Sequence, residues 1–315
     1  MRILITGAGG FVGSHLTAYL AEAGHTVYAA RHPEDHGSLS AAAAVYDLVL
    51  PDEEAVTSLL RRVQPQVVYH LAARSSAAAA WEHPFDTVDV NICGTLQILE
   101  GMRRCCPEAR LMLIGSAEVY GIPRSNVFGA AEDEPLQPAN LYGVTKACGE
   151  QLAMVYHKAY GLDVVAIRAY PHIGVGQSAE FVLSGFCRQL AAMEAGQQPA
   201  ELLVGNLQVR RDFTDVRDVV RAYGLLAEKG ISGRCYNVGS GKAVLLADVV
   251  EMLRSLCRIP FTLRTDPARM RPVDVPFQQA DIRRLMEDTG WSPKIPLRRS
   301  LKELLQAQRQ ALGCG

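Results

Sequence analysis

The chain has 315 residues, 49% of them hydrophobic, and a formal net charge of -1. This length predicts one large domain or two joined domains, with a core that needs no disulfide or metal ion. The balanced charge argues against nucleic acid or an anionic membrane surface as a partner. No apolar run reaches the roughly 18 residues of a membrane helix, and the first residues lack a signal-peptide pattern, so we expect a cytoplasmic protein.

The 8 cysteines lack the spacing of a structural zinc site. None forms a Cys-x-x-Cys pair, and no His-rich spacing accompanies them. Most lie in apolar patterns, where a free cysteine behaves as a small hydrophobe. We therefore expect no metal centre and reduced thiols, as in a cytosolic protein.

Strand-like and helix-like stretches alternate up to residue 168. Short apolar runs bounded by turn or polar residues predict strands at Ile3–Thr6, Thr26–Ala30, Val67–Leu71, Leu111–Ser116 and Val164–Arg168. Length and periodicity predict helices at Val12–Ala23, Glu53–Val63, Val88–Arg104 and Tyr142–Tyr160. This alternation implies parallel strands with right-handed crossovers, hence an α/β fold with a doubly wound parallel sheet.

Beyond residue 168 the alternation weakens, and Gly and Pro become frequent. Helices are predicted at Phe181–Glu194, Leu246–Leu256 and Ser300–Leu312, mixed with short strands. The segments Asp215–Lys229 and Cys235–Val238 read as a helix and a strand that return to the first domain. We therefore expect residues 1–168 with about 212–240 to form the first domain, and about 169–211 with 241–315 to form a smaller α/β substrate lobe.

Three glycines, Gly7, Gly10 and Gly13, follow the first predicted strand and open the first predicted helix. Glycine at these places allows a tight turn, close approach of the backbone to a pyrophosphate, and close packing of helix on sheet. The start of the helix offers unpaired N–H groups to phosphates. The motif predicts a dinucleotide site, with a glycine-rich turn that binds no ligand as the alternative.

The end of the second predicted strand carries Arg31, where a dinucleotide site often has a carboxylate for the ribose 2′-hydroxyl. A guanidinium there pairs with a 2′-phosphate, which favours NADP(H) over NAD(H). If Arg31 only stacks on the adenine ring, the protein uses either cofactor. Asp47, after the third strand-like run, is placed to accept a hydrogen bond from the adenine amino group or to cap a turn.

Tyr142 and Lys146 lie four residues apart on a predicted helix and therefore on one face of it. A phenol with its ordinary pKa of about 10 is a poor acid–base catalyst at neutral pH, and a neighbouring ammonium lowers that pKa. Ser116 ends a predicted strand, where its hydroxyl can share a substrate oxygen with Tyr142. Singly, these residues read equally well as a core tyrosine and a surface lysine; together with the glycine turn they predict a catalytic site.

With these motifs the sequence resembles the extended short-chain dehydrogenase/reductase family over essentially its whole length. The resemblance implies a Rossmann domain, a C-terminal lobe that binds a sugar nucleotide, a homodimer formed through a four-helix bundle, and a supporting role for Asn91 beside the active site. We also expect cofactor contacts from Phe11, Val12, Leu48, Leu71, Ala72 and Ala73. The resemblance is carried by Thr6–Gly13, His70–Ala73, Asn91–Thr95, Gly115–Gly121 and Tyr142–Lys146.

Later segments resemble the family's reductases that convert GDP-4-keto-6-deoxy-D-mannose to GDP-D-rhamnose. Arg211 and Arg271 are guanidinium forks suited to a diphosphate, or alternatively members of solvated or inter-lobe ion pairs, and Asp274 suits ribose hydroxyls. The sequence departs from the family at Pro171, where relatives carry an Asn that contacts the phosphates. Further substrate contacts are expected from His172, Gln177 and Asn206.

The sequence therefore predicts NADPH-dependent reduction of the C4 ketone of a GDP-linked 4-keto-6-deoxyhexose, with NAD(H) as a second cofactor. Tyr142 protonates the new alkoxide, Ser116 holds it, and Lys146 orients the nicotinamide ribose. Glu118 motivates the alternative of a sugar-nucleotide 4,6-dehydratase or epimerase, because dehydratases of this family carry there the glutamate that removes the C5 proton. A regulator that binds NADP(H) without turnover is a third alternative, although both Tyr142 and Lys146 are present.

Overall fold

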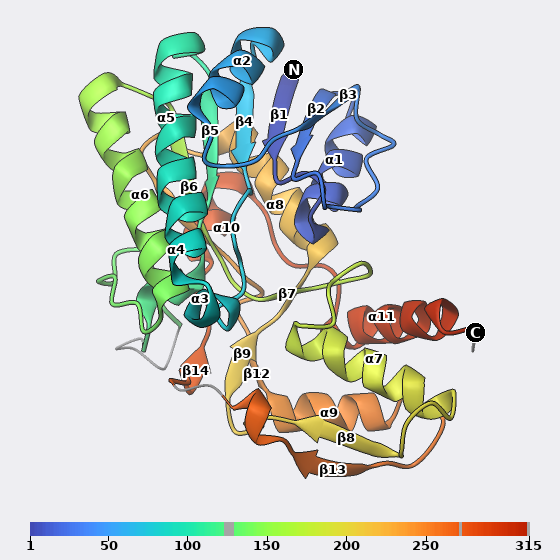
Figure 1. Ribbon diagram of the computed structural model, residues 1–315. Coiled ribbons are helices and arrows are strands. Elements are labelled where there is room, and N and C mark those ends of the chain that lie inside the picture. Colours follow the sequence, from blue (N-terminus) through green and yellow to red (C-terminus); the bar gives the residue numbers. More distant parts are fainter. Residues whose placement is uncertain (123–128, 271–272, 314–315) are drawn as a thin grey trace.

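The computed structural model describes residues 1–122, 129–270 and 273–313. A parallel sheet of seven strands runs through the first domain in the order β11-β6-β5-β4-β1-β2-β3 (Figure 1). This arrangement confirms the predicted doubly wound α/β fold. The strands are β1 (Arg2–Thr6), β2 (Thr26–Arg31), β3 (Ala44–Asp47), β4 (Val67–His70), β5 (Arg110–Ile114), β6 (Val164–Ala169) and β11 (Cys235–Val238).

Helices cover both faces of this sheet, so the strands are buried on both sides. One face packs against α1 (Phe11–Glu22) and α8 (Val216–Lys229), which also contact each other. The other face packs against α2 (Glu53–Val63), α5 (Gly94–Cys105) and α6 (Leu141–Tyr160). The strand order reverses between β1 and β4, and in such sheets ligands bind in the crevice outside the carboxyl ends at that point.

The predicted helix Val88–Arg104 is present as part of a longer continuous helical stretch, which contains a π-helical turn. The stretch consists of α4 (Pro84–Val88), the π-helical turn η1 (Asp89–Cys93) and α5, preceded by the short α3 (Ala79–Glu82). The β5 strand also ends at Ile114 rather than at Ser116, which instead caps the 3-10 helix η2 (Ala117–Tyr120). Both differences fall beside the candidate catalytic residues, where π-turns and strand ends are frequent.

The second lobe has its own apolar core. Its helices are α7 (Val182–Glu194), α9 (Leu246–Arg254) and α11 (Leu297–Ala311), with a short 3-10 helix η3 (Pro267–Arg269). Small sheets pair β8 (Glu201–Val204) with β13 (Thr262–Thr265), and β9 (Arg210–Asp212) with β12 (Ala243–Leu245) and β14 (Phe277–Gln278). A two-stranded pair, β7 (His172–Ile173) and β10 (Thr214–Asp215), connects the lobes.

The chain returns to the first domain once more than the sequence analysis expected. Helix α10 (Arg283–Thr289) packs against α8 and β11, and Leu285 and Trp291 are buried in the core of the first domain. Part of the expected segment 241–315 therefore lies with the Rossmann sheet. The sequence does not reveal which lobe these two apolar side chains pack against.

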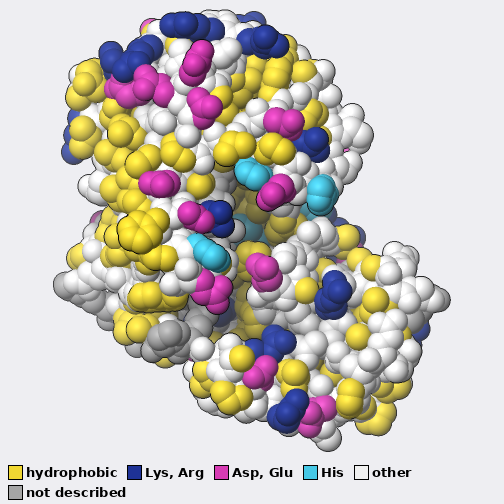
Figure 2. Space-filling view, viewed as in Figure 1, with side chains coloured by type: hydrophobic (Ala, Val, Ile, Leu, Met, Phe, Trp, Pro, Cys, Tyr) yellow, Lys and Arg dark blue, Asp and Glu magenta, His cyan; other side chains and the backbone are white. Residues whose placement is uncertain are grey.

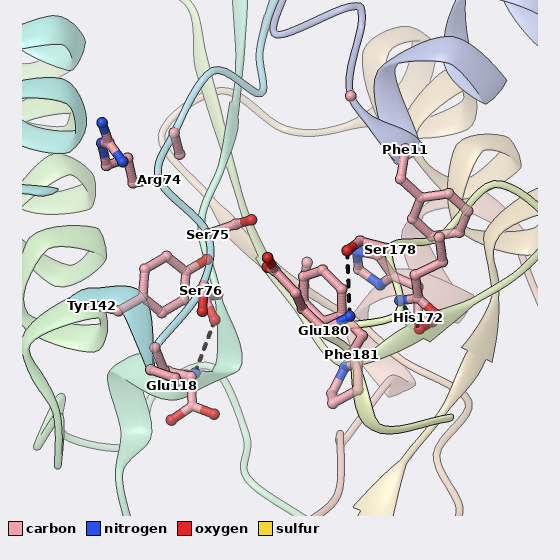
Figure 3. Close-up of a pocket in the computed structure, with 18 of the residues that line it drawn as sticks. Phe11, Arg74, Ser75, Ser76, Glu118, Tyr142, His172, Ser178, Glu180 and Phe181 are labelled. Atoms are coloured by element: carbon pink, nitrogen blue, oxygen red, sulfur yellow. Dashed lines mark hydrogen bonds between the residues drawn. The ribbon is translucent and has the colours of Figure 1, made fainter. Parts of the chain in front are cut away.

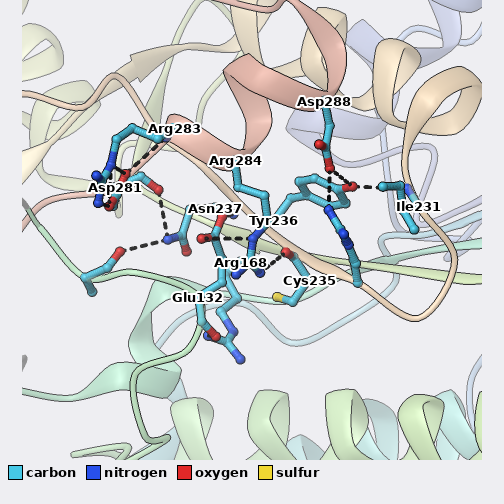
Figure 4. Close-up of polar contacts among 12 residues, drawn as sticks. Glu132, Arg168, Ile231, Cys235, Tyr236, Asn237, Asp281, Arg283, Arg284 and Asp288 are labelled. Atoms are coloured by element: carbon cyan, nitrogen blue, oxygen red, sulfur yellow. Dashed lines mark hydrogen bonds and ion pairs between the residues drawn. The ribbon is translucent and has the colours of Figure 1, made fainter.

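Polar contacts hold this returning segment to the edge of the sheet (Figure 4). The backbone N–H of Asn237 donates to Glu132, and its side-chain amide donates to the carbonyl of Asp281. Arg168 forms a buried ion pair with Glu150, with 2.7 Å between Nη2 and Oε1.

None of the helices within the described ranges combines the length and apolar character that crossing a bilayer requires.

Candidate active site

A large cleft runs along the carboxyl ends of the sheet and continues between the two lobes (Figure 2). It encloses about 1390 Å³. Pockets for a single small molecule reach about 1,000 Å³, so this cleft has room for a cofactor and a second ligand together. In the parts of the chain that the structure describes, no group of three His, Cys, Asp or Glu side chains is arranged to hold a metal ion.

The glycine turn lies at one end of the cleft, and each glycine has a distinct reason to be there. Gly7 has a φ of 71°, and a Cβ on it would lie 2.6 Å from the backbone nitrogen of Ala72. A Cβ on Gly13 would lie 2.3 Å from the Gly7 oxygen. A Cβ on Gly10 would meet only that oxygen at 3.4 Å, so Gly10 leaves the start of α1 open to the cleft. This cradle fits a dinucleotide pyrophosphate.

The candidate cofactor residues divide into two groups. Gly7, Gly10, Phe11, Val12, Gly13, Leu48, Leu71, Ala72 and Ala73 line the cleft. Arg31 and Asp47 are not among its lining residues and contact each other, with 3.4 Å between Nε and Oδ1. Asp35, which sequence reasoning missed, does line the cleft, because the loop after β2 folds back and Gly37 donates to the Gly9 carbonyl. Only that long-range fold places Asp35 there.

The three candidate catalytic residues meet on one wall of the cleft. Ser116 and Tyr142 both line the cleft, and Ser116 Oγ accepts from the backbone N–H of Glu118. Lys146 donates to the Ile114 carbonyl over 2.8 Å. Figure 3 shows Tyr142 and Glu118 on one side of the cleft, facing His172, Ser178, Glu180 and Phe181 on the other.

Burial determines the protonation of this group. It raises the pKa of Tyr142 to about 12, although the neighbouring Ser116 side chain opposes the rise. It lowers the pKa of Lys146 to about 8. The sequence argument expected Lys146 to lower the pKa of Tyr142; instead burial dominates, and the Lys146 ammonium is bound to the Ile114 carbonyl. At neutral pH Tyr142 is therefore a neutral phenol, ready to donate a proton.

Asn91 lies in the π-helical turn and supports the cleft floor. Its Oδ1 accepts from the backbone N–H of Arg74 at 2.8 Å, and its Nδ2 donates to the Arg74 carbonyl and to Thr145 Oγ1. Thr145 lies on α6 directly before Lys146. Asn91 thus ties the loop after β4 to the helix that carries Tyr142.

Both carboxylate oxygens of Glu118 have partners. Asn140, which caps α6, donates to Oε2 at 2.8 Å, and Gln278 donates to Oε1 at 3.3 Å. Gln278 is buried on β14 in the substrate lobe, so Glu118 bridges the two lobes. Sequence reasoning missed both partners. An Asn before the first helical residue is a recognisable cap, whereas nothing in the sequence marks Gln278.

On the opposite lobe, Arg211 and Asn206 both bind Asp274. The distance from Arg211 Nη2 to Asp274 Oδ1 is 2.7 Å, and Asn206 Nδ2 donates to Asp274 Oδ2 at 3.1 Å. Asp274, which is expected to receive ribose hydroxyls, forms an ion pair with Arg211 in this structure. All three residues line the cleft. Arg271 lies outside the described residues.

His172 and Gln177 lie at the junction of the lobes and line the cleft. Gln177 Nε2 donates to the His172 carbonyl at 2.9 Å. Within the described ranges, the buried Gln177 Oε1 and His172 Nδ1 atoms have no hydrogen-bond partner. Burial lowers the pKa of His172 to about 4, so its ring is neutral. Pro171 uses its carbonyl to accept from the Thr214 backbone N–H.

Comparison with known proteins identifies the chain's relatives. Residues 4–304 match the family model described as GDP-mannose 4,6 dehydratase. The chain is 35% identical over 304 residues to GDP-6-deoxy-D-mannose reductase of Pseudomonas aeruginosa, covering 96% of each protein. A structure of RMD from Pseudomonas aeruginosa in complex with NADPH superimposes with a TM-score of 0.84 at 30% identity, covering 99% of this chain and 100% of that one. UDP-glucose 4-epimerase of Thermotoga maritima with UDP-glucose gives a TM-score of 0.88 at 27% identity, over 99% and 100%.

Proposed function

The chain belongs to the GDP-mannose 4,6 dehydratase family, and from this premise we propose that it is an NADPH-dependent reductase of a GDP-linked 4-keto-6-deoxyhexose. The reaction converts GDP-4-keto-6-deoxy-D-mannose to GDP-D-rhamnose. The 35% identity to a GDP-6-deoxy-D-mannose reductase over 96% of the chain supports this choice within the family.

The observation that carries the proposal is the pairing of Glu118. A 4,6-dehydratase needs a base positioned over the C–H bond, whereas hydrogen bonds from Asn140 and Gln278 hold the Glu118 carboxylate between the two lobes. A ketone reduction needs a proton donor instead. Tyr142, whose pKa burial raises to about 12, is that donor.

Each candidate residue then has a role in the reduction. The bound cofactor supplies the hydride. Ser116 holds the ketone oxygen by a hydrogen bond, and Tyr142 transfers its proton to the oxygen as it becomes an alkoxide. Lys146 holds the nicotinamide ribose and stabilises the Tyr142 phenolate that remains. Arg211 binds the diphosphate of the sugar nucleotide, and Asn206 and Asp274 fix its orientation.

We infer that NADPH is preferred and that NADH is also used. Arg31 at the end of β2 favours the 2′-phosphate of NADPH, although it must leave Asp47 to reach it. Asp35 lines the cleft nearby and favours a free ribose hydroxyl over a phosphate. Because the charges of Arg31 and Asp35 have opposite effects, we expect only a moderate preference for NADPH over NADH.

The homodimer remains part of the proposal. Helices α5 and α6 expose apolar side chains at Leu96, Val155 and Tyr160, with Val155 and Tyr160 each 57% exposed. Large exposed apolar residues on adjacent helices favour a helical interface between two copies. A monomeric mass in light scattering at working concentrations would contradict it.

A second candidate is a sugar-nucleotide 4,6-dehydratase or epimerase, favoured by the TM-score of 0.88 with a UDP-glucose 4-epimerase. The two reactions differ in stoichiometry, since a reductase consumes NADPH and the others recycle their cofactor. The test is NADPH absorbance with GDP-4-keto-6-deoxymannose and its dTDP and UDP counterparts, with product stereochemistry determined by NMR. No net NADPH consumption with the GDP substrate, or release of a keto sugar from GDP-mannose, would reject the reductase.

A further inference from the structure

A chain of buried hydrogen bonds crosses the first domain beneath the cleft, and none of the roles assigned above uses it. Thr6 Oγ1 and His70 Nδ1 are 2.8 Å apart, and His70 Nε2 and Thr95 Oγ1 are 3.1 Å apart. Thr95 Oγ1 donates to the carbonyl of Asn91 at 2.7 Å. Thr6, His70 and Thr95 are each at most 5% exposed.

The partners determine which nitrogen of His70 carries the proton. The single hydroxyl proton of Thr95 is donated to the Asn91 carbonyl, which can only accept, so Thr95 must accept from His70 Nε2–H. In the neutral ring Nδ1 is then an acceptor, and the Thr6 hydroxyl donates to it. Burial, with the Lys146 charge, lowers the pKa of His70 to about 3, which keeps this tautomer neutral.

The two ends of this series of hydrogen bonds lie beside the glycine turn and beside the catalytic helix. Thr6 pairs with His70 across β1 and β4 and directly precedes Gly7. At the other end, Asn91 binds both backbone groups of Arg74 and the hydroxyl of Thr145, which in turn donates to the Tyr142 carbonyl. The contacts are therefore continuous from the glycine turn to the helix that carries Tyr142 and Lys146.

We propose that His70, through Thr95, is a positioning residue that fixes the catalytic helix α6 relative to the cofactor turn. This inference rests on the proposed function only in that α6 carries the proton donor. His70 does not line the cleft, so its loss changes the alignment of the reacting groups and not the groups themselves. Misplacing reacting groups by about 1 Å lowers turnover by about 10²-fold.

The test removes one hydroxyl and keeps the volume. Thr95→Val deletes the contacts to His70 and to the Asn91 carbonyl, whereas Thr95→Ser keeps the hydroxyl. Thr289→Val is the matched control, because Thr289 is 3% exposed, donates to the Leu285 carbonyl and accepts from the Trp291 N–H, in the α10 segment away from the cleft.

We expect Thr95→Val to lower kcat by about 10- to 100-fold with KM values within about twofold, the range seen when outer-shell partners of a functional residue are removed. Thr95→Ser should restore most of kcat, and Thr289→Val should lower the melting temperature with kcat unchanged.

Hydrogen exchange separates failure of this inference from failure of the proposed function. The Arg74 amide, which donates to Asn91, should exchange several-fold faster in Thr95→Val than in wild type, whichever sugar nucleotide is the substrate. An unchanged kcat and unchanged exchange in Thr95→Val, or equal loss in Thr95→Ser and Thr95→Val, would overturn the role of His70. Absence of turnover on GDP sugars by the wild-type protein, with the exchange difference present, would reject the substrate and retain the positioning role.

Discussion

Replacing Glu118 by Gln distinguishes reduction from dehydration. A dehydratase needs this carboxylate as the base that removes the C5 proton, whereas in a reductase it only forms hydrogen bonds. In the structure its Oε2 accepts from Asn140 at 2.8 Å and its Oε1 from Gln278 at 3.3 Å. A Gln at this position keeps one acceptor oxygen, which will face the closer donor, Asn140. Its amide nitrogen then faces the Gln278 amide, so the longer hydrogen bond is lost and the shorter one loses its charge.

The expected loss of turnover in Glu118→Gln follows from these changes in hydrogen bonding. The lost contact and the weakened one together cost about 1–2 kcal/mol. If the whole amount falls on the transition state, turnover falls by about 5- to 30-fold, since each 1.36 kcal/mol is about tenfold. Gln278→Leu removes the same longer contact, so the double variant should lose less than the sum of the two single losses.

Two assays read the outcome. NADPH consumption with GDP-4-keto-6-deoxymannose should survive in Glu118→Gln at the reduced rate, and neither protein should exchange the C5 proton of GDP-mannose with deuterated solvent. A loss of more than about 10³-fold in NADPH consumption, or C5 exchange in wild type that vanishes in Glu118→Gln, would refute the reasoning, because effects of this kind indicate that Glu118 transfers a proton.

Four further predictions concern other parts of the site. Tyr142→Phe should lower kcat at least ~10²-fold with little change in NADPH affinity, and near-normal turnover would reject Tyr142 as the proton donor. Arg31→Ala should weaken NADPH more than NADH by about one to two decades in binding titrations, whereas equal weakening would remove the argument for NADP preference. Because burial lowers the pKa of Lys146 to about 8, kcat/KM should fall as pH rises above about 8; Lys146→Arg, which stays charged, should lack this alkaline limb, and a limb that persists belongs to another group. Gly13→Ala should lower both the melting temperature and NADPH affinity, since its Cβ would lie 2.3 Å from the Gly7 oxygen; an unchanged thermal unfolding curve would contradict the close packing.

Local patterns were enough to predict much of the first domain. The α2 helix begins and ends as predicted, because Asp52 caps it and its apolar residues recur at helical spacing. The glycine turn and the spacing of Tyr142 and Lys146 are likewise local features. The π-helical turn at Asp89–Cys93 was missed, since such a turn adds a residue without disturbing the apolar pattern enough to reveal it.

The rest of the site depends on contacts between residues far apart in the sequence. Gln278 reaches Glu118 across 160 positions, and Asp35 enters the cleft only because its loop folds onto Gly9. Asp274 was assigned a ligand from its charge, but the ion pair with Arg211 could be found only in the folded chain. Periodicity and spacing carry no information on such pairings, which the tertiary packing determines.

The ion pair between Arg211 and Asp274 has a consequence for how tightly a substrate can be held. Arg211 is 8% exposed, and a buried guanidinium without a counter-ion would destabilise the fold by several kcal/mol. Asp274 supplies that counter-ion before any ligand arrives. If the proposed function holds, an entering diphosphate exchanges one anionic partner of Arg211 for another, and its affinity is the difference between the two interactions. The same carboxylate can take the guanidinium back when product leaves, so we expect such a site to release its anionic ligand readily.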